Sequence, residues 1–235
     1  MRFGVAQIRL SNEIGTNVEK MSSYLRSAVS LGVDFLCFPE CSLTGYIRDF
    51  HNIDWDEVAQ GLDKLQEAVA TEGVIIAVGT PHAEVSKLYN AAIVISADDR
   101  LKYFKHHLTD FDKQYFAEGQ DRLSFEVKGT KCSLLICRDQ DDPQLAQEYA
   151  RADTKIIFFL AAHYYPMAEA RRKVNKNRAL PIARAVENRL FVAKANAVGS
   201  QGKYVNLGHS MIVDPEGSVV CEADEEEEKL LYYDL

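Results

Sequence analysis

The chain has 235 residues, of which 47% are hydrophobic and 26% charged, and its formal net charge at pH 7 is -8. This is enough apolar material for one domain over residues 1–235, and the dispersed bases argue against a nucleic-acid partner. No apolar run approaches the roughly 18 residues of a membrane span, and the first residues lack the apolar stretch of a signal peptide, so we expect a cytoplasmic protein with no membrane partner.

The first half of the chain alternates between strand and helix patterns. Helices are indicated where apolar residues recur at three- and four-residue spacing, and strands where short apolar runs follow a glycine or a turn. We expect strands at residues 3–8, 33–38, 74–78, 89–95 and 100–104, and helices at residues 17–31 and 56–71. An irregular polar stretch follows at 105–121, and such loops often carry function.

The second half of the chain is richer in strands. We expect strands at residues 123–127, 132–136, 156–160, 190–195, 208–213, 219–221 and 229–233, and helices at residues 143–150 and 170–188. Pro181 favours a break in the second of these helices, because proline removes a backbone donor. The acidic run at 222–228 is interpreted as a solvated hairpin loop. Strands this apolar need cover on both faces, so the pattern predicts an α/β fold of two sheets packed face to face with helices outside.

Three residues with chemical potential stand directly after predicted strands. They are Glu40, Lys105 and Cys137. Each has an ordinary structural interpretation, as a solvated strand end, a surface charge and a small buried hydrophobe. Together they fit one chemistry, because a thiol needs a base to become a thiolate and a developing oxyanion needs a cation or N–H donors. The crevice beyond the carboxyl ends of the strands is where such groups would meet.

Metal and disulfide chemistry are not indicated. The five cysteines form no C-x-x-C pair, and their odd number leaves at least one thiol free. The adjacent residues His106 and His107 should point to opposite sides of an extended segment, which suits neither a chelate nor a shared base. We therefore expect no metal and no cofactor.

The motifs around these residues support a resemblance that covers nearly the whole chain. They read "DFLCFPECSLTGY", "LKYFKHHLTDFDKQYFAEG" and "CSLLICRD", followed by "ARAVENRLFVAKANAVG" and "NLGHSMIVDPEGSVV". The chain resembles the nitrilase, or carbon-nitrogen hydrolase, superfamily, whose signature is a glutamate, a lysine and a cysteine. The resemblance implies a four-layer αββα sandwich with two mixed sheets, catalytic roles for Glu40, Lys105 and Cys137, no cofactor, and a homodimer or higher homo-oligomer.

The chain departs from the family pattern near the expected site. Asp112 stands where many members have a second glutamate. After the nucleophile, Asp139 and Pro143 are retained, but Asp141 and Asp142 are new acids, which either face water at a helix N-terminus or repel an anionic substrate.

Further candidates for supporting the site or binding the substrate flank these positions. Arg138 contributes its backbone N–H to the expected oxyanion site. His163, Tyr164 and Tyr165 follow the strand at 156–160 and are candidates to line the pocket, although aromatic residues after a strand are more often packing.

The expected activity is hydrolysis of a small amide or N-carbamoyl compound through a cysteine thioester, with release of ammonia or an amine. An amide is favoured over a nitrile, because nitrilases commonly carry Trp-Glu after the nucleophile and this chain has Arg138-Asp139. Nitrile hydrolysis, acyl transfer by the same site, and a catalytically idle binding or scaffold protein are the alternatives.

Overall fold

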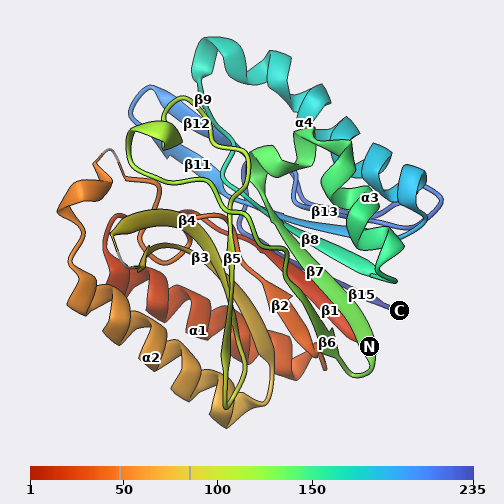
Figure 1. The fold of residues 1–235 in the computed structure, drawn as a ribbon, viewed down its shortest axis with the longest axis horizontal. Helices are drawn as coiled ribbons and strands as arrows, with labels where there is room; N and C mark the ends of the chain where they lie inside the picture. Colours follow the sequence, from red (N-terminus) through yellow and green to blue (C-terminus); the bar gives the residue numbers. More distant parts are fainter. Residues whose placement is uncertain (48, 85) are drawn as a thin grey trace.

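A computed structural model describes residues 1–47, 49–84 and 86–235. The first half of the chain and its final strand build a six-stranded mixed sheet (Figure 1). The strand order is β15-β1-β2-β3-β4-β5. These strands are β1 (Arg2–Gln7), β2 (Phe35–Cys37), β3 (Ile75–Glu84), β4 (Lys87–Ile95), β5 (Arg100–Phe104) and β15 (Lys229–Asp234). β1, β2 and β3 are parallel, and β15 and β4 are antiparallel to them. β5 is antiparallel to β4, so it runs in the same direction as β3.

The second half builds another six-stranded mixed sheet, with the order β14-β13-β10-β8-β7-β6. Its strands are β6 (Ser124–Val127), β7 (Thr130–Ile136), β8 (Ile156–Ala161), β10 (Phe191–Asn196), β13 (Met211–Val213) and β14 (Val219–Glu222). β7, β8 and β10 run parallel to one another. In both sheets, therefore, parallel strands deliver their carboxyl ends to one edge.

Two pairs of helices cover the outer faces of the two sheets (Figure 1). α1 (Ile14–Ser30) and α2 (Trp55–Glu72) pack on the first sheet, and α3 (Pro143–Arg151) and α4 (Met167–Asn188) pack on the second. On β2, Leu36 faces α1 and α2, while Phe35 and Cys37 face the second sheet, as the alternation of side chains along a strand requires. The predicted αββα sandwich is confirmed.

Three short strands were not predicted. β9 (Tyr164–Pro166), β11 (Val198–Gln201) and β12 (Tyr204–Leu207) form a small separate sheet in the order β11-β12-β9. β9 has only three residues and pairs with β12 across a long stretch of chain. Local periodicity carries no signal for such a pairing, which tertiary contact decides.

The predicted break at Pro181 is wrong, because α4 runs without interruption from Met167 to Asn188. Pro181 has no backbone N–H to offer the carbonyl of Asn177, one helical turn earlier. The buried amino group of Lys194 on β10 donates to that carbonyl at 2.9 Å. A side chain from the neighbouring sheet thus takes the place of the missing helical donor.

The acidic segment at 222–228 is not the hairpin loop that the sequence suggested. β14 belongs to the second sheet and β15 to the first, so this segment carries the chain from one sheet to the other. The backbone carbonyls of Asp224 and Glu227 accept hydrogen bonds from the side chain of Gln7 on β1, at 2.7 and 2.8 Å. The connection is therefore held against the first sheet by its backbone.

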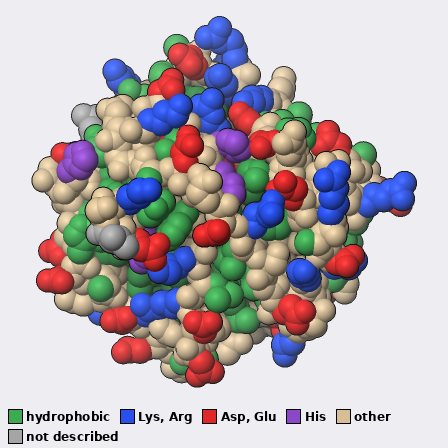
Figure 2. All heavy atoms as spheres, viewed as in Figure 1, with side chains coloured by type: hydrophobic (Ala, Val, Ile, Leu, Met, Phe, Trp, Pro, Cys, Tyr) green, Lys and Arg blue, Asp and Glu red, His purple; other side chains and the backbone are tan. Residues whose placement is uncertain are grey.

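The surface of the molecule carries charges of both signs. On the face shown in Figure 2, basic and acidic side chains are interspersed, so no field of one sign covers that face. Among the residues that the structure describes, no helix combines the length and apolar character needed to span a bilayer.

Candidate active site

The structure brings Glu40, Lys105 and Cys137 together between the two sheets. Glu40 follows β2, Lys105 follows β5 directly, and Cys137 follows β7 directly. Lys105 Nζ donates to Glu40 Oε1 at 2.6 Å, and the Glu40 carboxylate is near enough to Cys137 to raise the pKa of its thiol. Two sheets therefore contribute to one cluster, with the carboxylate and the ammonium from the first and the thiol from the second.

Cys137 sits at a sharp turn of the backbone. Its φ of 46° lies in the left-handed region, and it opens the short 3₁₀ helix η3 (Cys137–Asp141). Such a conformation costs on the order of 1–3 kcal/mol in a residue with a side chain, and it occurs where the surroundings impose it, often at functional sites. The residue remains partly exposed. Burial and the Glu40 carboxylate raise the pKa of the thiol well above 9, so the thiol needs a base.

Glu40 is held by three donors. Besides Lys105, the amide of Asn90 donates to Oε1 at 2.8 Å, and the backbone N–H of Ala162 donates to Oε2 at 3.1 Å. Burial raises the pKa of Glu40 even though Lys105 lowers it. A carboxylate that attracts protons more strongly than usual is suited to act as a general base near neutral pH.

Gly79 on β3 makes room for the Glu40 turn. A Cβ at this position would lie 2.4 Å from the backbone nitrogen of Cys41 and 2.7 Å from Cα of Glu40. Only glycine permits this approach. Gly79, Asn90 and Ala162 were not predicted from the sequence as parts of the site. A glycine inside a strand pattern is the one signal that could have indicated a close backbone approach.

Asp112 joins the cluster, as its position in the lysine motif suggested. Its Oδ2 accepts from Lys105 Nζ at 2.8 Å, and its Oδ1 accepts from the hydroxyl of Tyr46 at 2.5 Å. Burial works to raise the pKa of Asp112, but Lys105 and the hydrogen bonds outweigh it and the pKa is lowered. Burial likewise opposes the charge on Lys105, yet the surrounding anions raise its pKa well above 10.5. Lys105 is therefore a fixed cation between two carboxyl groups.

Asp139 ties the lysine segment to the nucleophile turn. Its two oxygens accept from the backbone N–H groups of His106, His107 and Ile136 and from the hydroxyl of Tyr103, at 2.8–3.1 Å. The side chain is fully buried, and burial raises its pKa. Both oxygens of this carboxylate accept hydrogen bonds from the protein, so its role is to hold the lysine segment against the nucleophile turn and not to contact the substrate. The side chain of Arg138, next to it, is exposed.

The three aromatic candidates after β8 have different environments. His163 is only 3% exposed, its backbone N–H donates to Asn196 Oδ1 at 3.1 Å, and its ring Nε2 lies 3.1 Å from the side-chain nitrogen of Gln140. Tyr164 is half-buried and stacks on Tyr46 with 6.2 Å between ring centroids. Tyr165 is also half-buried and stacks on His163. Tyr164 thus lies beside Tyr46, the residue whose hydroxyl donates to Asp112, and His163 is more deeply buried.

The two new acids after the nucleophile both have partners. Asp142 caps α3 by accepting from the backbone N–H of Gln144 at 2.8 Å, and it lies 2.9 Å from the ring of His107. Asp141 is paired with Lys176 at 2.7 Å. The helix-terminus interpretation is confirmed for Asp142, and the charge of Asp141 is offset by a lysine.

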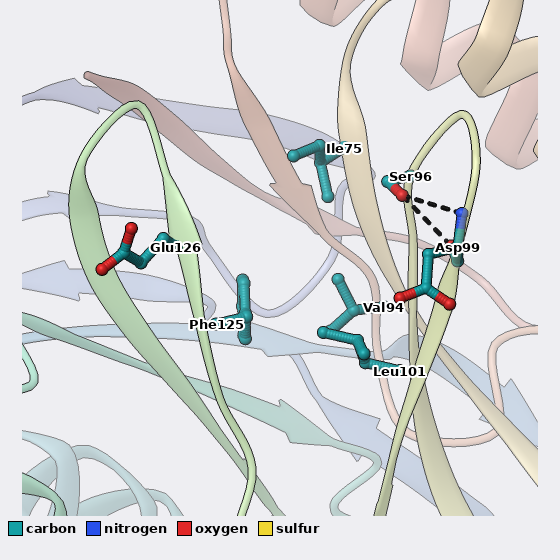
Figure 3. Close-up of a pocket in the computed structure, with 7 residues that line it drawn as sticks. All are labelled: Ile75, Val94, Ser96, Asp99, Leu101, Phe125 and Glu126. Atoms are coloured by element: carbon teal, nitrogen blue, oxygen red, sulfur yellow. Dashed lines mark hydrogen bonds between the residues drawn. The ribbon is translucent and has the colours of Figure 1, made fainter.

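The hollow drawn in Figure 3 is not part of this site. It is lined by Ile75, Val94, Ser96, Asp99, Leu101, Phe125 and Glu126. Ile75 begins β3, and Leu101 lies at the start of β5, whereas Glu40 and Lys105 follow the far ends of β2 and β5. The hollow therefore lies at the opposite end of the sandwich.

The chain is similar in sequence to curated amidases over most of its length. Mouse omega-amidase NIT2 is 32% identical, over 100% of this chain and 88% of its own length. The 2-oxoglutaramate amidase of Bacillus subtilis is 30% identical, over 90% of this chain and 81% of its own length.

A solved structure supports the same assignment at the level of the fold. A crystal structure of an amidase from Nesterenkonia sp. superposes with a TM-score of 0.89 at 23% identity, covering 100% of this chain and 90% of that one. The sequence model of the family described as "Carbon-nitrogen hydrolase" matches residues 2–235. The chain belongs to the carbon-nitrogen hydrolase family.

Proposed function

We propose that this protein hydrolyses the C–N bond of a small amide or N-carbamoyl compound, with Cys137 as the nucleophile and a thioester as the intermediate. The observation that carries the proposal is the buried arrangement in which Lys105 bridges Glu40 and Asp112 beside the Cys137 thiol. A base, a cation and a nucleophile within one cluster are what acyl transfer requires. The 235 residues act as one catalytic domain.

In the first half of the reaction, Glu40 takes the proton from Cys137 Sγ as the sulfur attacks the carbonyl carbon. The oxyanion that forms is stabilised by Lys105 and by the backbone N–H of Arg138. Two of the three N–H donors of Lys105 are directed at Glu40 and Asp112, so the third is available for the oxyanion. Glu40 then gives its proton to the leaving nitrogen, and the C–N bond breaks.

In the second half of the reaction, water attacks the thioester. Glu40 accepts a proton from that water, the C–S bond breaks, and the proton returns to Cys137. The same carboxylate therefore alternates between base and acid. Asp112 has a supporting role, because it holds Lys105 from the side opposite Glu40. Tyr164 and His163 are proposed to border the acyl pocket, with Tyr164 nearer the Asp112 side.

The relatives support the amide class. Those at about 30% identity are named omega-amidase and 2-oxoglutaramate amidase. Amides at the end of a dicarboxylic acid therefore belong in the first substrate panel, together with small aliphatic amides and N-carbamoyl compounds. The cytoplasmic location and the homo-oligomeric state stay predictions.

The test is mass spectrometry of the intact protein after rapid acid quench with that panel, combined with an assay for released ammonia. Wild type should gain the mass of the acyl group and release ammonia, and Cys137→Ala should do neither. Cys221→Ala is the matched control, because Cys221 is a partly exposed cysteine on β14 and should leave the adduct intact. Turnover that persists in Cys137→Ala would refute the assignment. Absence of any adduct and product across the panel would favour an idle binding protein.

A further inference from the structure

The peptide at Ala162 and His163 is clamped from two sides. On one side, Oδ1 of Asn196, at the end of β10, accepts the backbone N–H of His163 at 3.1 Å. On the other side, the ring of His163 contacts Gln140 of the nucleophile turn at 3.1 Å. Asn196, His163 and Gln140 are all at most 3% exposed. Buried polar contacts with two neighbouring segments therefore set the orientation of the peptide group between Ala162 and His163.

The N–H of Ala162, one residue before the clamped peptide, points at the reacting groups. It donates to Glu40 Oε2 at 3.1 Å. The same N–H lowers the pKa of the Cys137 thiol, against the larger opposing effects of burial and Glu40. A donor shared between the base and the nucleophile acts on the proton that passes between them.

Asn196 is itself fixed by a buried network that spans both sheets. Its Nδ2 donates to the carbonyl of Gly208 at 2.5 Å, and its backbone N–H donates to Ser210 Oγ at 2.9 Å. Ser210 Oγ donates to the Asn196 carbonyl at 3.2 Å, and its backbone N–H donates to Gln7 Oε1 at 2.9 Å. Gln7 stands on β1 of the first sheet. These hydrogen bonds fix the orientation of the Asn196 side-chain amide, so its Oδ1 is directed at the backbone N–H of His163.

From this geometry we propose that Asn196 is a positioning residue for the reaction. It keeps the Ala162 N–H directed at Glu40, beside Cys137, by fixing the following peptide, and Ser210 holds Asn196 in place. The proposal rests on the proposed function for its kinetic consequence. The effect of Asn196 on the reactivity of the Cys137 thiol can be measured without turnover, so it does not depend on the proposed function.

The consequence is a loss of rate without a loss of substrate affinity. Removing one direct donor to a developing charge costs roughly 10²–10³ in kcat. Asn196 acts at one remove, so Asn196→Leu should lower kcat by about tenfold to a hundredfold, with KM within about threefold. Without a directed Ala162 N–H, the thiolate is less stabilised, so the pH midpoint for alkylation of Cys137 by a neutral reagent should rise by about half a unit or more.

The experiment compares Asn196→Leu and Ser210→Ala with wild type. The rate of Cys137 alkylation by iodoacetamide is followed as a function of pH by peptide mass spectrometry, which separates Cys137 from the other cysteines. Steady-state kinetics and thermal unfolding are measured in parallel. Ser133→Ala is the matched control, because Ser133 is as buried as Ser210 and its hydroxyl lies 2.9 Å from Thr154 near the far end of β7.

The expected result is an upward shift of the alkylation midpoint and a fall in kcat for Asn196→Leu, with a smaller change in the same direction for Ser210→Ala. Ser133→Ala should lower thermal stability and leave both quantities at the wild-type values. Equal loss of stability in all three variants with an unchanged midpoint would overturn the proposal. Because Ser210→Ala removes only one oxygen, it keeps the test decisive where Asn196→Leu does not fold. A shifted midpoint in an enzyme that turns over no amide would leave the positioning role standing and refute the proposed function.

Discussion

Lys194 should make the stability of the protein depend on pH in the neutral range. The side chain is fully buried on β10, and burial lowers its pKa from 10.5 to about 7, against the opposing charges of Glu222 and Cys137. In the unfolded chain a lysine titrates near its ordinary value of about 10.4. Between about pH 7 and pH 10.5 the unfolded state therefore binds more protons than the folded state, and the free energy of unfolding rises with pH.

The size of the effect follows from that difference. One pKa unit corresponds to about 1.4 kcal/mol, so the rise between about pH 7 and pH 8.5 amounts to about 1.5 kcal/mol once partial protonation at the lower limit is included. The window ends at about pH 8.5, because cysteine thiols in the unfolded chain begin to ionise there. Urea unfolding of wild type and Lys194→Met across this window measures the contribution directly. Lys155→Met, at an exposed position, is the control.

A second substitution separates the charge of Lys194 from its hydrogen bond. Lys194→Met leaves the Asn177 carbonyl without its donor, which costs about 1–3 kcal/mol for a buried group. Pro181→Ala restores a backbone N–H one turn later in α4, so the double variant should recover stability while still lacking the pH slope. If Lys194→Met unfolds with the same dependence on pH as wild type, the account of Lys194 as a buried, mostly neutral amine at slightly alkaline pH is wrong.

Three further outcomes follow from the site. Asp139→Asn should lower the free energy of unfolding by about 2–4 kcal/mol, because in either orientation the NH₂ group of the amide faces two groups that now donate to the carboxylate. Urea unfolding measures this loss, and a loss below about 1 kcal/mol would contradict the prediction. Tyr46→Phe removes a donor to Asp112 and should lower kcat by about threefold to tenfold with little change in KM, so unchanged steady-state kinetics would argue against a role for Asp112 in catalysis. Because Glu40 must be ionised to act as a base and burial raises its pKa above 4.5, kcat/KM should rise with pH through a midpoint above that value, and a profile that stays flat down to about pH 4.5 would exclude Glu40 as the base.

The residues of the cluster could be predicted from the sequence because each stands at the end of a strand. Parallel strands place their carboxyl ends at one edge, so Glu40 and Cys137 were expected in one crevice. Lys105 follows β5, which is antiparallel to β4 and therefore ends at the same edge as β2, and its place was also indicated by the resemblance of its motif. Asp112 was expected from the same motif, and the structure places its oxygen 2.8 Å from Lys105.

Other parts of the site had no readable signal. The donor at Ala162 is a backbone N–H, which any residue except proline would supply, so its identity says nothing about its role. Asn90 lies inside β4, and the sequence alone shows only a polar residue in an apolar strand. Its role becomes visible only in the structure, where its amide donates to Glu40. The small sheet of β9, β11 and β12 depends on pairing between distant segments of three or four residues. Pro181 was misinterpreted because the compensating donor, Lys194, lies on another element.

The path of the final strand has a consequence for how the protein could be divided. β15 leaves the second half of the chain and pairs along its whole length with β1 in the first sheet. A fragment ending before β6 would hold Glu40 and Lys105 but leave the outer edge of β1 bare, and its complement would hold Cys137 and carry β15 as an orphan strand. Such fragments are complementary by construction. Mixing them should restore a shared catalytic centre only when β15 docks on β1, so recovery of activity would report reassembly of the two sheets.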